Sequence, residues 1–201
     1  MSAAPSGGDP DGGRLWRRPK TRWLLGIPLG AFLAAIVGAA GITGFVSAVH
    51  LSSTETFCIS CHEMRDNVYE EYKKTIHYSN PAGVRATCPD CHVPKSWGPL
   101  LMRKIGATFK ELPHHFEGML DSREKVQSKR LEMAQWVWNA MKSTDSRECR
   151  NCHAIEHMDL EAQDKMARKK HAPEHLAETG ETCIDCHKGI AHTLPEMAES
   201  E

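Results

Sequence analysis

The sequence predicts a mainly α-helical protein with one N-terminal membrane helix and a small, loop-rich outer domain. Three observations carry this prediction. An uncharged apolar stretch occupies residues 23–49, helical patterns of apolar residues recur after it, and signals for β-strands are weak throughout. The 201-residue chain has eight cysteines and twelve histidines but only 6% aromatic residues, which is little for a conventional hydrophobic core of this size.

Residues 23–49 are long enough to cross a membrane as one helix. At helical rise the stretch spans about 40 Å, against about 30 Å of hydrocarbon. A cleaved signal peptide is the alternative, but its apolar region would run only about 7–15 residues. Basic residues crowd the chain before the stretch, whereas only Arg65 falls in the twenty residues after it. The positive-inside rule therefore predicts a single-pass inner-membrane protein, with residues 1–22 as a cytoplasmic basic tail and residues 50–201 in the periplasm.

Small residues recur every four positions along this stretch, at Gly26, Gly30, Ala34 and Gly38. Such a stripe lets two membrane helices approach closely, so the anchor is a candidate face for a homodimer. Small residues are also common in membrane helices that do not pair, and this alternative stays open.

All eight cysteines fall in four copies of the motif Cys-x-x-Cys-His. The copies are Cys58-Cys61-His62, Cys88-Cys91-His92, Cys149-Cys152-His153 and Cys183-Cys186-His187. This motif attaches haem c through its two cysteines and offers its histidine to the iron. Neither a disulfide framework nor a zinc site needs a histidine after every cysteine pair. The sequence therefore predicts four covalently bound haems, whose porphyrins supply the apolar surface that the side chains lack.

The outer domain is predicted to contain two dihaem repeats, about residues 50–120 and 144–195. Each repeat carries a basic pair, then a histidine, then a haem motif. His77 precedes Cys88 by 11 residues, and His171 precedes Cys183 by 12. A two-haem unit used twice is the simplest explanation of this pattern.

Two helices are predicted within and between the repeats. The linking segment, about residues 121–143, has the apolar spacing of a helix, with Asp121 as its cap and Glu124 three residues further on. A shorter amphipathic helix is expected over residues 100–112, where Pro113 ends it.

A low-spin haem iron needs a second axial ligand besides its motif histidine. Three histidines outside the motifs are predicted to serve: His77, His171 and His192. His77 and His171 occupy equivalent places in the two repeats, and His175 is the alternative to His171. His192 lies too close to its own motif to reach the far face of that iron, so it is expected to bind a neighbouring haem.

Four irons and three such histidines leave one iron without a histidine partner. His114 and His115 follow a proline in a predicted surface loop and are expected to be unliganded. Only the first motif is followed by a methionine, Met64, whose thioether sulfur is also a haem ligand. The first haem, close to the anchor, is therefore expected to be bound by Met64 or His62 and to have an open or weakly held sixth position.

The segments around these residues resemble the NapC/NirT family of membrane-anchored tetrahaem quinol dehydrogenases. The resemblance rests on CISCHEM, KKTIHYSNPAGVRATCPDCHVPKSWGP, TDSRECRNCH and ETCIDCHKGIAHTLP, and it covers the anchor and nearly all of residues 50–195. The NapC branch is the most similar. The resemblance implies that the chain oxidises membrane quinol and passes electrons to a periplasmic reductase. Nitrate reductase is favoured, and nitrite reductase, as in the NirT branch, is the alternative.

The resemblance also implies roles for individual ligands. In one branch of the family, a methionine at the place of Met64 binds the first haem. By the same match His192 binds the second haem, His171 the third and His77 the fourth.

The family further places a lysine and an acidic residue beside the first haem as the quinol site. These positions fall on Lys104 and Glu111, although the acid is aspartate in several relatives. The two residues are seven apart, which is two turns along one face of an α-helix. A carboxylate can accept a quinol proton, and a lysine can stabilise the anionic form. The alternative is two solvated charges on a surface helix.

Two other classes of function stay open. A small catalytic multihaem reductase would use an open iron, but it needs a concentrated ring of basic and hydrogen-bonding residues, and the sequence shows none. A passive docking subunit would carry haems without contacting quinol. The formal net charge of −1 predicts no nucleic-acid partner. Electron transfer of the quinol dehydrogenase type, rather than conventional enzyme catalysis, is therefore expected.

Overall fold

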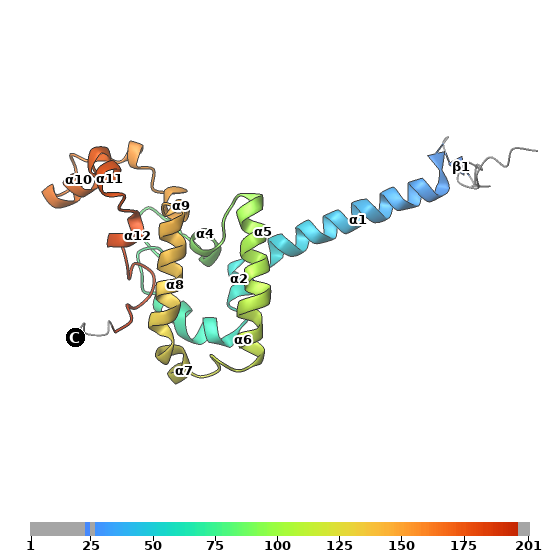
Figure 1. Cartoon of the computed structure of the whole chain (residues 1–201), viewed down its shortest axis with the longest axis horizontal. Coiled ribbons are helices and arrows are strands. Elements are labelled where there is room, and N and C mark those ends of the chain that lie inside the picture. Colours follow the sequence, from blue (N-terminus) through green and yellow to red (C-terminus); the bar gives the residue numbers. More distant parts are fainter. Residues whose placement is uncertain (1–22, 25–26, 197–201) are drawn as a thin grey trace, which may run out of the picture. The chain divides into compact units, whose positions relative to one another are not determined.

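The structure is a computed structural model that describes residues 23–24 and 27–196. The chain divides into two units, Met1–Val49 and His50–Glu201 (Figure 1). The predicted cytoplasmic tail, residues 1–22, lies outside the described residues, as does Gly26 of the small-residue stripe.

The first unit contains helix α1 (Leu29–Leu51), which covers most of the predicted anchor and runs on to the first residues of the second unit. It is long and apolar enough to cross a membrane, and its side chains from Gly30 to Phe45 are all exposed. A helix that is apolar on every side is expected of a membrane span. The helix begins at Leu29 rather than at residue 23, because the chain before it forms two short antiparallel strands, β1 (Trp23–Leu24) and β2 (Ile27–Pro28).

The second unit is built of short helices joined by loops, and its described residues contain no strand. The helices are α2 (Glu55–Cys58), η2 (Met64–Val68), α3 (Tyr69–Tyr72), α4 (Cys88–His92), α5 (Trp97–Gly106), η3 (Ala107–Glu111), α6 (Leu112–Phe116), α7 (Arg123–Ser128), α8 (Arg130–Ser143), α9 (Arg147–Arg150), η4 (Ile155–His157), α10 (Lys165–His171), α11 (Pro173–Thr179) and α12 (Cys183–Cys186). The predicted mainly α-helical class is confirmed.

The second and fourth motifs fold alike because their sequences share the pattern Thr-Cys-x-Asp-Cys-His. Thr87 caps α4 and Thr182 caps α12, and in each case an aspartate three residues on completes a capping box. The cysteines therefore stand on a single helical turn, with the motif histidine at or just past its end.

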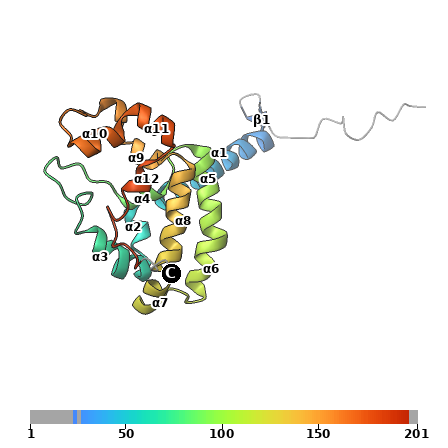
Figure 2. The same ribbon diagram turned by 60° about the vertical axis from the view of Figure 1, so that its left-hand side comes forward.

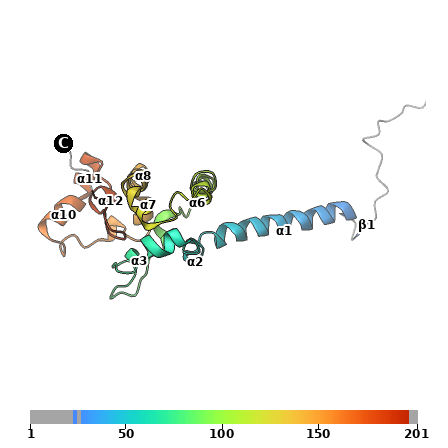
Figure 3. The same ribbon diagram turned by 90° about the horizontal axis from the view of Figure 1, so that it is seen from below.

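Helices α5, η3 and α6 form one continuous column, residues 97–116. Figure 3 looks nearly along its axis. The predicted end at Pro113 is wrong, because the central segment η3 is a π-turn in which Leu112 N–H bonds to the carbonyl of Ala107. Bonding to the fifth preceding residue shifts the register, and Pro113 then lies in the first turn of α6, where a missing N–H is tolerated.

The predicted linking helix, residues 121–143, is in fact two helices, α7 and α8, which meet at Lys129. The cap is also one residue later than predicted. The side chain of Ser122 accepts the N–H of Lys125, while Asp121 pairs with the Lys125 ammonium group at 2.8 Å. Figure 2 shows α8 beside the α5–α6 column, and Arg103 of α5 lies 5.4 Å from the ring centroid of Trp136 of α8.

The second unit has very little apolar core. Among its described residues, the buried apolar side chains are Tyr72, Pro94, Val126, Ile184 and Pro195, whereas six polar or charged residues are buried. Such a small apolar core contributes little to offset the conformational entropy lost when a domain of this size folds. The haem motifs predict porphyrins as additional buried apolar groups.

Candidate haem site

Each of the four motif histidines lies beside one other histidine. The ring centroids are 6.3 Å apart for His62 and His115, 6.2 Å for His92 and His192, 6.2 Å for His153 and His77, and 5.9 Å for His187 and His171. Two imidazoles on opposite sides of one metal ion have centroids about 6.2 Å apart, since the metal–nitrogen bond is about 2.0–2.1 Å and a ring nitrogen lies about 1.1 Å from the centroid. All four pairs therefore have the spacing that fits an iron between two histidines.

The hydrogen bonds of these rings agree with metal binding. Nδ1 of His171 lies 2.7 Å from Oε1 of Gln163, which leaves Nε2 of the ring available to a metal. Nδ1 of His77 and of His192 is buried without a hydrogen-bond partner in the described part of the chain. Buried ring nitrogens usually have such a partner. Burial, and secondarily the neighbouring His192, lower the pKa of His92 to about 4, so this ring is neutral and can donate a lone pair.

The structure places the predicted distal histidines differently from the family-based assignment in two cases. His192 lies beside the second motif, as the resemblance implied, but His77 lies beside the third motif and His171 beside the fourth. The motif neighbours of these last two are the reverse of that assignment, and their roles as iron ligands stay a prediction. His175 is held elsewhere, with its Nε2 2.9 Å from Oε2 of Glu181.

Two of the four pairs cross between the predicted repeats. His77 of the first repeat meets His153 of the second, and His192 of the second meets His92 of the first. In these two pairs, each predicted repeat places a histidine beside a motif of the other. Spacing within one repeat could not have indicated this arrangement.

The first motif has a histidine partner that the sequence reasoning missed. His115, expected to be unliganded, lies beside His62, and its Nδ1 is 2.6 Å from Oε1 of Glu63. The same oxygen lies 3.5 Å from Nε2 of His62. Met64 begins the π-turn η2 and is 45% exposed. His115 is thus a second candidate ligand beside the first motif, and Met64 as a ligand of the first haem stays a prediction.

Glu63 is a buried carboxylate at the centre of this group. Burial alone would raise its pKa, but hydrogen bonds from its own backbone N–H and from His115 lower it below the ordinary value. Histidines that bind metals commonly donate their second ring N–H to a carboxylate, which fixes the tautomer and the ring orientation. Glu63 can accept such a hydrogen bond from Nδ1 of His115. In the sequence, only the shortfall of one histidine against the four predicted irons pointed to a further candidate ligand.

The four motifs are neighbours in space in the order in which they occur along the chain. Helix α2 packs against α4, and α4 packs against α9; their labels follow one another across Figure 1. Burial, and then the neighbouring Cys58 thiol, raise the pKa of Cys88 to about 11, and burial with Cys149 nearby does the same for Cys91. The backbone N–H of Ile184, in the fourth motif, donates to Oγ of Ser146, just before the third.

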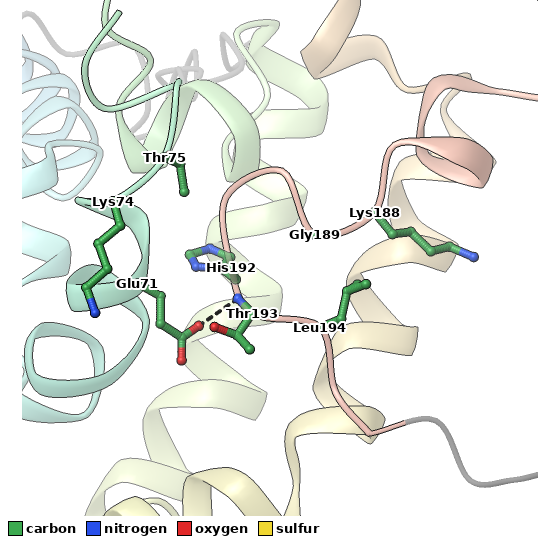
Figure 4. Close-up of a pocket in the computed structure, with 8 residues that line it drawn as sticks. All are labelled: Glu71, Lys74, Thr75, Lys188, Gly189, His192, Thr193 and Leu194. Carbon is green, nitrogen blue, oxygen red and sulfur yellow. Dashed lines mark hydrogen bonds between the residues drawn. The ribbon is translucent and has the colours of Figure 1, made fainter. Parts of the chain in front are cut away.

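Two cavities adjoin these histidines. The larger, of about 480 Å³, is lined by His192, with Lys74 and Lys188 on opposite sides (Figure 4). The smaller, of about 190 Å³, is lined by Cys91 and His92 of the second motif. A cavity that a motif cysteine and its histidine share is where the attached porphyrin would lie. The two lysines line the other, larger cavity, where they flank His192.

The predicted quinol residues have different hydrogen-bond partners. The Lys104 ammonium group donates to the carbonyl of Ser52 at 2.5 Å and lies close enough to Cys58 to interact electrostatically, while burial lowers the Lys104 pKa. Glu111 instead forms a bidentate ion pair with Arg103 and is 45% exposed. The π-turn causes this, because its extra residue per turn brings position 103 rather than 104 onto the face of 111. Lys104 is thus beside the first motif, whereas Glu111 faces solvent.

The chain combines an apolar helix long enough to cross a membrane with a helical unit that carries four haem-attachment motifs and paired histidines. These features define a membrane-anchored c-type cytochrome. The chain belongs to the NapC/NirT cytochrome c family, whose N-terminal-region profile matches residues 20–197. The protein is therefore a cytochrome with covalently bound haem c.

Curated relatives are similar over nearly the whole chain. The denitrification system component NirT of Stutzerimonas stutzeri is 54% identical over 190 residues, which is 93% of this chain and 90% of the relative. The cytochrome c-type protein NapC of Escherichia coli K12 is 48% identical over 190 residues, 94% of this chain and 92% of the relative. The cytochrome c-type protein TorY of Escherichia coli O157:H7 is 45% identical over 166 residues, 82% of this chain but 44% of TorY. No solved structure matches the chain.

Proposed function

We propose that this protein carries four haems, oxidises membrane quinol at the first, and passes the electrons to a periplasmic reductase. Nitrate reductase is the favoured acceptor, and a nitrite reductase is the second candidate. The observation that carries the proposal is the series of four histidine pairs whose motifs follow one another in space. Such a series suits stepwise electron transfer from one end of the domain to the other.

The proposed ligand set is two histidines for each iron. The pairs are His62 with His115, His92 with His192, His153 with His77, and His187 with His171. When bound, haem c supplies reversible one-electron chemistry. The chain supplies the ligands, the carboxylate of Glu63 behind His115, and the spacing of the motifs. No motif histidine lacks a partner, which disfavours a catalytic reductase that needs an open iron.

Quinol oxidation releases two electrons and two protons, so the entry site needs groups that handle protons. Lys104 is the best placed, since its ammonium group lies near Cys58 of the first motif and burial lowers its pKa. It can hold the quinol oxygen and stabilise the anion left after the first proton departs. Glu111, held by Arg103 at the surface, is suited to passing a proton on to water.

The proposed topology follows the charge asymmetry of the sequence. Residues 1–22 are placed in the cytoplasm and the haem unit in the periplasm, with α1 crossing the inner membrane. We also propose a homodimer through the small residues of α1, Gly30, Ala34 and Gly38, which recur every four positions.

Anaerobic reduction of the purified full-length protein tests the quinol proposal. A soluble quinol analogue should reduce its haems without any partner protein, and Lys104→Met should slow that reduction about a hundredfold, as expected for losing a proton-handling group. Reduction of the variant by dithionite, which needs no such group, should be unchanged. Lys165→Met, a basic residue on α10, is the matched control. Equal rates for wild type and Lys104→Met would refute Lys104 as part of the site, and no reduction of wild type by quinol would refute the function.

A further inference from the structure

The column of α5, η3 and α6 presents an apolar face that no part of the described chain covers. Its members, here called the apolar stripe, are Met102, Ile105, Phe109, Leu112 and Phe116, whose exposed fractions are 68%, 51%, 76%, 46% and 78%. They are three or four residues apart, the spacing of side chains along one side of a helix. The π-turn widens the stripe without breaking it. Contiguous exposed apolar surface of this kind marks an interaction site.

The column is fastened to the place where the candidate membrane span ends. The ring of Trp97, in its first turn, meets that of His50 edge to face with centroids 6.4 Å apart. The Lys104 ammonium group donates to the carbonyl of Ser52, one residue after the last residue of α1. Two contacts thus hold α5 to residues 50–52, the first residues of the second unit.

The charge and residue types of the column suit a lipid surface. Between residues 97 and 116 it carries three cations, Arg103, Lys104 and Lys110, against one anion, Glu111. Basic residues beside an apolar stripe are typical of helices that lie in the interface of an anionic membrane. Trp97 is 49% exposed, and tryptophan favours that same interface.

The apolar stripe lies outside the two cavities that adjoin His92 and His192. None of the five residues lines either of the two cavities beside the motif histidines. The column also carries His115, whose ring lies beside that of His62. The five side chains of the apolar stripe are exposed.

From this geometry we infer that the apolar stripe lies in the headgroup boundary of the membrane that α1 crosses, as a second, in-plane membrane contact. The occupant is lipid, and Lys110 and the other cations face the headgroups. With the helix α1 and the stripe both bound, the haem unit cannot turn freely about its anchor. Lys104 and the first motif are then held at the membrane surface. The inference rests on the proposed membrane topology, but it stands whether or not quinol is the donor.

The unmodified protein offers a matched pair of methionines for the first test. Met102, in the stripe, and Met166, on α10, are 68% and 67% exposed. Full-length holoprotein is placed in vesicles of phosphatidylethanolamine and phosphatidylglycerol and treated with chloramine-T, and sulfoxide at each site is followed by mass spectrometry. Met102 should be oxidised at least about tenfold more slowly than Met166, because lipid excludes the oxidant. Equal rates would overturn the inference.

A second test identifies what covers the stripe. A photoreactive benzophenone residue replaces Phe109 in one variant and Met166 in the other, and both holoproteins are irradiated in the same vesicles. Lipid adducts should form at position 109 and not at 166. Adducts of position 109 with haem peptides, with a second copy of the chain, or with nothing would each overturn the inference. Slow quinol reduction alongside normal lipid adducts would count against the proposed function alone.

Discussion

Arg130 and Glu71 form a buried ion pair whose removal gives the most informative stability test. Their side chains are 10% and 17% exposed, and the guanidinium binds both carboxylate oxygens, at 2.6 and 3.0 Å. Arg130 also donates to the carbonyl of Thr193 at 3.0 Å, and the N–H of Thr193 donates to Glu71 at 2.9 Å. Figure 4 shows this last bond beside His192. The pair therefore holds both the backbone carbonyl and the backbone N–H of Thr193, the residue that follows the proposed haem ligand His192.

Arg130→Ala should lower the free energy of unfolding by about 3–5 kcal/mol, because it leaves the Glu71 carboxylate buried and without its countercharge. It should also release Thr193, so that His192 loses its position and one haem gains high-spin character. Guanidinium unfolding in detergent, followed by circular dichroism, measures the first effect, and electron paramagnetic resonance measures the second. Lys73→Ala, which removes the exposed Lys73–Glu70 pair, is the control and should cost no more than about 1 kcal/mol.

The pH dependence of the pair has a definite sign. Burial acts to raise the Glu71 pKa, but the bonds from Arg130 and the Thr193 N–H outweigh it, so the folded pKa lies below the ordinary 4.5. The contribution of Glu71 is therefore complete above about pH 4.5 and is lost as the pH falls through the folded value. Arg130→Ala should flatten this part of the stability profile. If the variant unfolds like wild type and all four haems stay low-spin, the reasoning is refuted.

The other predictions concern the haems. His115→Ala should convert one haem to high spin, whereas Met64→Leu should leave all four spectra unchanged; the reverse pattern would restore Met64 as the ligand. Glu63→Gln should raise the midpoint potential of one haem and leave three unaltered in spectropotentiometry, because His115 loses the carboxylate that strengthens it as a donor; four unchanged potentials would show that Glu63 does not act on a haem. Chains produced without haem attachment should lack stable tertiary structure, since the apolar core is so small; slow proteolysis and a cooperative melt would contradict this.

The features that depend on local sequence were predictable. The four haem motifs, the apolar anchor and the helical class are each set by residues a few positions apart. The ends of the helices were less predictable. The column runs past Pro113 because the π-turn of η3 shifts the hydrogen-bond register, and nothing in the residue pattern signals that turn.

The ligand pairs could be predicted only in part. His77, His171 and His192 were identified as candidates from their spacing, but their partners depend on how the two halves interlock. His115 was expected to be unliganded because a proline followed by two histidines is typical of a loop, whereas here these residues continue a helix and His115 lies beside His62. Lys104 and Glu111 were expected on one helix face because an uninterrupted α-helix was assumed, whereas the π-turn pairs Glu111 with Arg103.

Counting haems and their ligand types in the oxidised full-length protein tests the central claim most directly. Intact mass gives the number of attached haems, and electron paramagnetic resonance with magnetic circular dichroism gives the axial ligands of each. We predict four haems per chain, all low-spin and all bound by two histidines. A chain with fewer than four haems, a high-spin haem, or a first haem with histidine and methionine as its ligands would contradict the four histidine pairs.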